Sequence, residues 1–125
     1  MKPTKGQTKR FWEWCGFQKI ENPTADLGWI YSAPDKNYLS LKGYPEIDLD
    51  HLGLIFKYAM PKLSHHWDMW IESWVDQPNM FIARFQTHTG EFIKFIETEI
   101  IETDKNPALA LFWAIYKIIE EETET

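Results

Sequence analysis

The chain has 125 residues, with 19 acidic side chains against 13 basic ones and a formal net charge of −6. Its seven tryptophans, eight phenylalanines and five tyrosines each offer on the order of 150–250 Å² for burial, which excludes disorder for the bulk of the chain. The single cysteine, Cys15, excludes an internal disulfide. A length within the usual ~100–150 residues of one domain predicts a single core.

Charge is unevenly distributed between the two ends of the chain. Residues 1–19 hold five basic side chains and one acidic side chain, whereas residues 120–124 hold four glutamates. We expect a flexible basic arm over residues 1–8, one α+β domain over 9–121 and an acidic tail over 122–125. The first residues lack the apolar stretch of a secretory signal, and the longest apolar run, Ala108 to Tyr116, is shorter than the ~20 residues that span a bilayer. We therefore expect a cytoplasmic protein without a membrane partner.

The first third of the chain predicts one short helix followed by irregular structure. Thr8 is placed to cap a helix over Lys9–Cys15, which Gly16 would end. From Phe17 to Tyr44, turn residues surround short extended pieces at 29–31 and 38–41. This pattern predicts a loop-rich segment with one hairpin.

A second, amphipathic helix is predicted behind an Asp48 cap. Pro61 lies inside the pattern and removes a backbone donor, so the last turn should bend or end early. The apolar positions follow helical spacing: Leu49, Leu52, Phe56, Ala59 and Leu63.

Three strands are predicted next, over 66–75, 80–87 and 91–101, with turns at 76–79 and 88–90. A three-residue loop ending in Gly90 would pair Arg84 with Lys94, and the first turn would pair Glu72 with Arg84. One face of this sheet then carries Met69, Ile71, Val75, Phe81, Phe85, Ile93 and Phe95. The other face carries Trp70, Trp74, Ile82, Phe92 and Ile96, with Glu72, Arg84 and Lys94 in a row between them.

Both faces of this sheet are therefore apolar, although an antiparallel sheet with one wet side should alternate cleanly. Each face needs cover, from helices of the same chain or from another subunit. The last helix, from Pro107 to about Glu120 behind an Asn106 cap, is apolar around nearly its whole circumference and should be buried on more than one side. The expected fold is a three-layer α/β/α sandwich of the α+β class, with helices on both faces of an antiparallel sheet of three to five strands.

Four segments carry a resemblance to a known family: residues 14–17 (WCGF), 28–29 (GW), 57–63 (KYAMPKL) and 106–115 (NPALALFWAI). In these segments the chain resembles the small bacteriophage and prophage proteins of the phage ABA-sandwich domain type. The resemblance implies a three-layer helix/sheet/helix domain encoded by a phage or an integrated element. These are packing motifs, so the resemblance implies no catalytic residues.

The best candidate site is the row of Glu72, Arg84 and Lys94 flanked by Trp70 and Trp74. Charge beside aromatic surface suits a polar small molecule or a sugar, but an ion-pair network that only stabilises the sheet is the stronger interpretation. A second group of carboxylates follows on the last strand, where charge discourages edge-to-edge association: Glu97, Glu99, Glu102 and Asp104.

Catalytic, metal and cofactor sites are not predicted. His65 and His66 are sequence neighbours that point to opposite faces of an extended segment, and His51 and His88 lie elsewhere, so no metal-binding spacing appears. Cys15 stands among aromatic residues and is interpreted as a core residue rather than a nucleophile.

The abundance of tryptophan predicts a contact surface, because tryptophan is favoured at protein interfaces. We expect a phage-encoded, non-enzymatic accessory or interaction domain in the host cytoplasm, whose partner is a protein, either a host factor or a second copy in a homodimer. The acidic body argues against nucleic acid. The alternative is a small-molecule-binding or hydrolase-like domain that uses the Glu72, Arg84 and Lys94 row.

Overall fold

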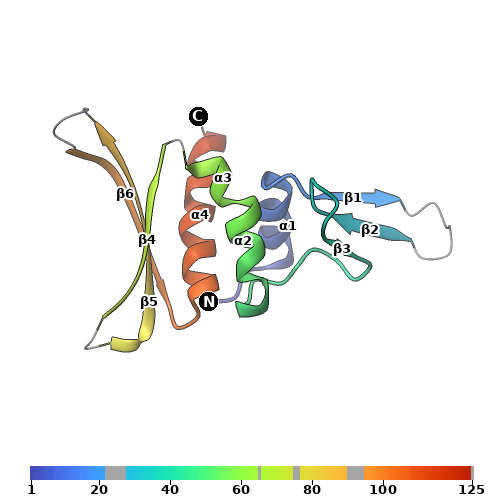
Figure 1. Ribbon diagram of the computed structural model, residues 1–125, viewed down its shortest axis with the longest axis horizontal. Helices are drawn as coiled ribbons and strands as arrows, with labels where there is room; N and C mark the ends of the chain where they lie inside the picture. The colour runs from blue at the N-terminus through green and yellow to red at the C-terminus, as the bar shows by residue number, and fades with distance from the viewer. Residues whose placement is uncertain (22–27, 65, 75–76, 90–94, 125) are drawn as a thin grey trace. The chain divides into compact units, whose positions relative to one another are not determined.

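The computed structural model describes residues 1–21, 28–64, 66–74, 77–89 and 95–124. The chain divides into two compact units, and each is described by itself: residues 3–46 form the N-terminal unit, and residues 47–125 with Met1 and Lys2 form the C-terminal unit. Helices occur in both units, and each unit contains one three-stranded antiparallel sheet (Figure 1). The α+β class is therefore confirmed, and the single domain over residues 9–121 stays a prediction.

Helix α1 (Lys5–Trp14) begins one turn earlier than predicted. Thr4, not Thr8, caps it: the Thr4 hydroxyl accepts a hydrogen bond from the Gln7 N–H at 3.1 Å, and the Gln7 side chain accepts one from the Thr4 N–H at 2.9 Å. This reciprocal pair satisfies two backbone donors at the start of the helix. The expected flexible arm over residues 1–8 is therefore helical from Lys5 onward.

The predicted stop at Gly16 is confirmed, and its geometry explains the choice of residue. Gly16 has φ +99°, and a Cβ atom there would lie 3.3 Å from the Pro34 side chain. The Phe17 N–H bonds back to the Trp12 carbonyl at 2.9 Å and closes the helix end. Only glycine combines this backbone conformation with so close an approach.

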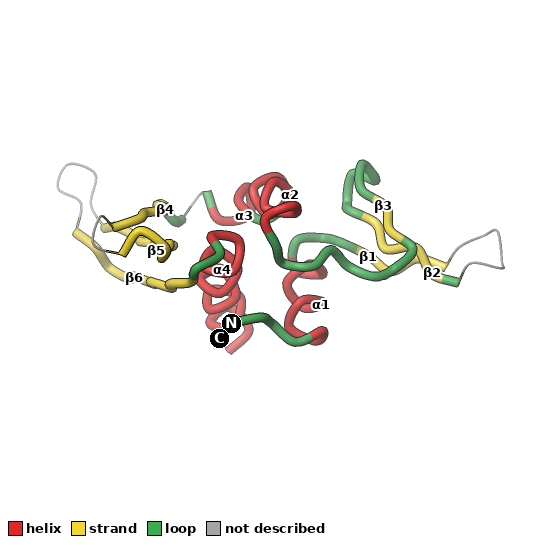
Figure 2. Tube along the Cα trace, turned by 90° about the horizontal axis from the view of Figure 1, so that it is seen from below, coloured by secondary structure: helices red, strands yellow, loops and turns green. Residues whose placement is uncertain are grey.

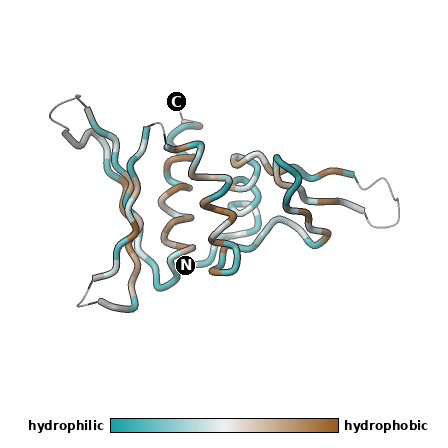
Figure 3. Tube along the Cα trace, viewed as in Figure 1, coloured by the Kyte–Doolittle hydropathy of each residue, from teal (hydrophilic) through white to brown (hydrophobic). Residues whose placement is uncertain are grey.

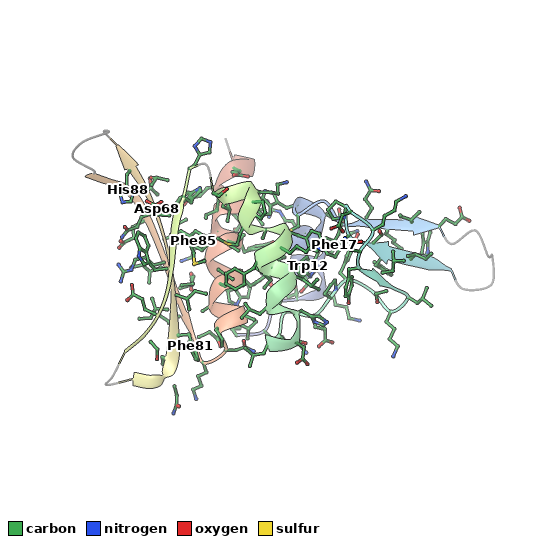
Figure 4. All side chains as sticks on the ribbon, in the orientation of Figure 1. Trp12, Phe17, Asp68, Phe81, Phe85 and His88 are labelled. Carbon is green, nitrogen blue, oxygen red and sulfur yellow. The ribbon has the colours of Figure 1, made fainter. Side chains whose placement is uncertain are left out.

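The N-terminal unit then forms a small sheet, β1 (Gln18–Glu21), β2 (Trp29–Ser32) and β3 (Leu39–Ser40), in that order. The two extended pieces predicted at 29–31 and 38–41 correspond to β2 and β3, which pair as a hairpin, and β1 is the strand that the sequence did not predict. The core of this unit includes Trp12, whose indole N–H donates to the Pro45 carbonyl at 2.7 Å and whose ring lies 4.7 Å from the Phe17 ring (Figure 4). Cys15 is buried, as expected.

In the C-terminal unit, the helix predicted from Leu49 to Leu63 is divided into three pieces: η1 (Leu49–His51), α2 (Leu52–Tyr58) and α3 (Met60–Leu63). The Asp48 cap is confirmed, because its carboxylate accepts from the His51 N–H at 3.0 Å. The break before α3 falls where Pro61 lacks a backbone donor.

The division of this helix also changes which residues are buried. Leu49 and Phe56 were predicted for the apolar stripe, yet they are exposed. The 3₁₀ turn rotates the following residues relative to a continuous α-helix. The buried residues of α2, α3 and their junction are Ile55, Tyr58, Ala59 and Leu63.

The C-terminal sheet has the order β4 (Asp68–Trp74), β5 (Gln77–Thr89) and β6 (Phe95–Asp104). The predicted β4–β5 pairing is off by two residues, because Trp70 and not Glu72 lies opposite Arg84. The predicted β5–β6 pairing is off further, because Arg84 lies opposite Ile101 rather than Lys94. The two-residue error preserves the faces, so Met69, Ile71, Phe81 and Phe85 share one face as predicted.

Helix α4 (Pro107–Glu124) lies between this sheet and α2, as Figures 1 and 2 both show. Asn106 caps it as predicted, accepting from the Ala108 N–H at 2.9 Å. Both sides of the helix are buried, which explains its apolar circumference, and hydrophobic residues recur along it in Figure 3. Within the described residues, no helix has the length and hydropathy needed to cross a membrane.

The layers of the C-terminal unit are thus the sheet, α4 and then α2. Phe85 is fully buried on the face toward α4 (Figure 4). Ala83, two residues earlier on the same strand and therefore on the same face, is fully buried as well. Within the described residues of this unit, the helix that packs against the sheet is α4. A layer over the opposite face, as the three-layer sandwich requires, is not confirmed.

Candidate functional site

The candidate site lies on the face of β4, β5 and β6 that points away from α4, called here the outer face. Alternation along the strands puts one set of described side chains on it. Its members are Asp68, Trp70, Glu72, Ile82, Arg84, Gln86, Glu99, Ile101 and Thr103. Three of the five residues predicted for the site, Trp70, Glu72 and Arg84, are therefore together on this face.

Arg84, on the central strand, holds the outer face together electrostatically. Its Nε lies 3.3 Å from the Glu72 carboxylate on β4, and its Nη1 donates to the Glu99 carboxylate on β6 at 3.2 Å. The Nε is buried and its contact with Glu72 is an ion pair without hydrogen-bond geometry. One guanidinium therefore links all three strands, while its side chain stays one-quarter exposed.

Glu99 is the residue of this network that the sequence did not assign to it. It accepts from Arg84 and also from the Gln86 side chain on β5. The sequence placed Glu99 on a solvated strand edge, because the assumed register put Lys94 beside Arg84. The correct register puts Glu99 diagonally across from Arg84, so its role depends on the length of the β5–β6 connection.

The remaining two predicted site residues cannot be added to this network. Lys94 lies outside the described residues, and so does the side chain of Trp74, whose backbone ends β4. Two residues that the sequence predicted for this face, Phe92 and Ile96, cannot be placed on it either. Residue 92 lies outside the described residues, and only the backbone of Ile96, as part of β6, is described.

Apolar side chains are open to solvent on the outer face. Trp70 is 42% exposed and Ile101 is 41% exposed, on either side of Arg84, whereas Ile82, two residues away on the central strand, is buried. The charged groups among the members of the face named above are the carboxylates of Asp68, Glu72 and Glu99 and the guanidinium of Arg84, so carboxylates outnumber cations there.

An aspartate–histidine pair lies at the end of the same sheet. The Asp68 carboxylate lies 2.7 Å from His88 Nδ1, and Figure 4 shows the two side chains together. Such a pair can orient an imidazole for proton transfer, but a nucleophile within hydrogen-bond reach is also required. In the described part of the chain, no hydroxyl or thiol is hydrogen-bonded to His88, so the geometry gives the pair no catalytic assignment.

Two further carboxylates of β6 are also paired, and the side chain of Glu97 lies outside the described residues. Glu102 pairs with Lys117 of α4, and Asp104 pairs with the amino group of Met1, whose carbonyl accepts from the Trp113 indole at 2.7 Å. Burial alone would raise the pKa of Asp104, but hydrogen bonds from the Met1 amino group and from backbone N–H groups of Lys105 and Asn106 outweigh it and lower that pKa. These pairs fasten β6 to its surroundings.

A metal site would need several histidine, cysteine or carboxylate side chains close together. Among the residues that the structure describes, no group of three such side chains could hold an ion. His51 pairs with Asp48 at 3.0 Å next to the start of α2, and His65 lies outside the described residues.

Comparison with known proteins supplies no family. The chain matches no protein-family model, no curated protein and no solved structure. Function must therefore be argued from the outer face itself.

Proposed function

We propose that the chain is a non-enzymatic interaction domain that binds a protein through the outer face of β4, β5 and β6. The observation that carries this proposal is the exposure of Trp70 and Ile101 beside Arg84, which is already held by two carboxylates. Exposed tryptophan next to a fixed charged group is typical of the residues that dominate binding energy at interfaces.

Charge favours a basic partner over a second copy of the chain. The described outer face carries three carboxylates and one guanidinium, and residues 47–125 with Met1 and Lys2 carry 14 acidic and seven basic side chains. Two such faces would repel each other. The partner is therefore a protein segment with apolar side chains flanked by lysine or arginine, and a homodimer is the competing outcome.

The partner would supply the missing layer. In this proposal the three-layer α/β/α arrangement is completed when an element of the partner lies over the outer face, which relieves the exposure of its apolar residues. The resemblance of residues 14–17, 28–29, 57–63 and 106–115 to phage ABA-sandwich proteins supports a phage or prophage origin and action in the host cytoplasm, with a host factor as the partner.

The test is differential capture with matched charge substitutions. Trp70→Glu and Ile101→Glu place a carboxylate on the outer face, and Phe56→Glu places one at an α2 position of similar exposure, 39% against 42% for Trp70. A host polypeptide retained by the wild type and by Phe56→Glu, but lost from both outer-face variants, is the expected result.

Three outcomes contradict the proposal. One is a set of captured proteins that is the same for all four chains, and another is loss of binding in Phe56→Glu alone. The third is a dimer: light scattering gives the wild type twice the mass of one chain, and Trp70→Glu lowers that mass to the mass of one chain. The occupant of the outer face would then be a second copy.

The alternative is a ligand-binding or hydrolase-like site built from the Glu72, Arg84 and Lys94 row. Arg84 already has two carboxylate partners, so an anionic ligand would have to compete with both. The interaction role therefore agrees better with the geometry of Arg84.

A further inference from the structure

A second surface, in the N-terminal unit, has a different chemistry. The β1–β2 register places Lys19 directly opposite Tyr31, with Trp29 two residues further along β2 on the same face. The Lys19 ammonium lies 4.6 Å from the centroid of the Trp29 ring and 5.9 Å from that of Tyr31. These are cation–π distances.

Lys19 keeps its charge available for a further partner. Among the described residues, no carboxylate forms an ion pair with it. Aromatic rings attract an ammonium through their quadrupole but do not neutralise it, and they accept none of its hydrogen bonds in the way a carboxylate does. The two rings thus hold a cation whose N–H donors can still bind an anion.

A hollow of about 440 Å³ adjoins this cation, and Lys9, Glu13, Phe17, Gln18, Lys19 and Tyr44 line it. Its volume is within the ~300–1,000 Å³ of small-molecule sites. The Glu13 carboxylate lies 3.8 Å from the Lys9 ammonium and offsets its charge. Lys19 is the other charged residue of the lining, so the lining has a net charge of about +1 at neutral pH.

Two aromatic side chains outside the lining adjoin it through lining residues. The ring of Tyr44, which lines the hollow, packs edge-on against Tyr31 at 4.9 Å between centroids, and Trp29, beside Lys19, is 47% exposed. Burial, Glu13 and Tyr31 all raise the pKa of Tyr44, so its hydroxyl is neutral and can donate or accept a hydrogen bond at neutral pH. Cation, hydroxyl and flat apolar surface are all present within one small region.

We propose that this hollow binds a small organic anion in which a carboxylate or phosphate is joined, directly or through a sugar, to a flat ring. Lys19 pairs with the anionic group at the edge of the hollow, the ring contacts Trp29 next to Lys19, and Tyr44 and Gln18 supply hydrogen bonds. A nucleic-acid strand is disfavoured, because residues 3–46 hold six basic and five acidic side chains and do not provide the run of cations that a polyanion needs. This site is independent of the outer face.

The experiment is a titration of the full chain, followed by the indole N–H resonance of Trp29 in ¹H–¹⁵N spectra. Adenosine monophosphate and 4-hydroxybenzoate are ring-bearing anions of the two kinds, adenosine is a ring without the anion, and inorganic phosphate is an anion without the ring. We expect at least one ring-bearing anion to bind about tenfold more tightly than adenosine and phosphate, a difference of the size that one charge pair contributes. Which one binds identifies the anionic group.

Variants decide whether Lys19 is responsible. Lys19→Met should weaken binding of the preferred anion by about tenfold, Lys19→Arg should retain it, and Lys36→Met, at another exposed lysine of the same unit, should leave it unchanged. Dispersed amide spectra show whether each variant is folded, and Lys19→Arg decides the matter if Lys19→Met is not. Equal affinity of Lys19→Met and wild type, or no displacement of the Trp29 resonance by either ring-bearing anion, overturns the proposal.

Discussion

The two sheets of this chain have the same strand number and opposite surroundings. In β4, β5 and β6, the central strand is packed under α4 and carries the fully buried Ala83 and Phe85. In β1, β2 and β3, every residue of β1 is exposed and the strands are two to four residues long.

The difference shows what a covering helix contributes. A sheet with one face under an apolar helix gains hydrophobic stabilisation along its whole length and can extend to strands of 7–13 residues. A short sheet without such cover depends on local contacts, here those of Lys19 with Trp29 and Tyr31. The face under α4 therefore uses an aromatic residue, Phe85, as core, whereas the uncovered N-terminal sheet holds Trp29 at the surface.

The largest expected effect contrasts one aromatic residue from each sheet. Phe85→Ala should lower the free energy of unfolding by about 3–5 kcal/mol, because it leaves a cavity in a fully buried position. Trp29→Ala, at 47% exposure, should lower it by less than about 1 kcal/mol. Urea denaturation followed by circular dichroism measures both, and equal losses would show that the two sheets do not differ as described.

Two glycines sharpen the comparison at the level of the backbone. Gly16→Ala should cost about 1–3 kcal/mol, because φ is +99° and the new methyl group would meet Pro34. Gly53→Ala lies in α2 with open space around it and should stabilise by up to about 1 kcal/mol. The two substitutions should shift the midpoint of thermal unfolding in opposite directions. A stabilising Gly16→Ala would contradict the positive φ of residue 16 at the end of α1.

A smaller effect concerns the network on the outer face. Arg84→Met leaves Glu72 and Glu99 without their shared cation and should destabilise by about 1–2 kcal/mol, with more loss at low salt, where repulsion is least screened. Lys62→Met, an exposed lysine of α3, is the control and should change stability little. If Arg84→Met is as stable as the wild type at low salt, the network contributes nothing to the free energy of unfolding.

The smallest effect is pH-dependent and involves Asp104. Its pKa is lowered in the folded chain, so the stabilisation is fully present above the pKa of the unfolded chain and is lost as the pH falls through the folded value. Asp104→Asn should cost less than about 1 kcal/mol at neutral pH, and this difference should shrink below about pH 4. A difference that stays constant down to pH 2 would contradict the pairing with the Met1 amino group.

Much of the C-terminal unit could be predicted from the sequence, because its signals are local. Asp48 and Asn106 are caps read from residue type and position, and the apolar circumference of α4 required burial on two sides. The alternation of Trp70, Glu72, Ile82 and Arg84 along their strands placed these residues on one face, since an error of two residues does not change the face.

The predictions that failed depend on the lengths of connections and strands, which residue type does not determine. The β5–β6 register follows from the connection between Thr89 and Phe95, which is longer than the predicted three-residue turn, and so Glu99 was missed and Lys94 was wrongly paired with Arg84. At the N-terminus, Thr4 and Thr8 both fit a cap, and only the reciprocal bond with Gln7 distinguishes them. The N-terminal sheet was underestimated because its strands are too short to show periodicity.

Binding through the outer face requires that this face of β4, β5 and β6 is open in the free chain. Hydroxyl-radical footprinting of the isolated protein, read by mass spectrometry for each tryptophan, tests it directly. With an open face, Trp70 (42% exposed) should be oxidised about as fast as Trp29 (47% exposed) and far faster than the fully buried Trp12. Protection of Trp70 to the level of Trp12 would mean that the face is already covered, and the proposed binding surface would not exist.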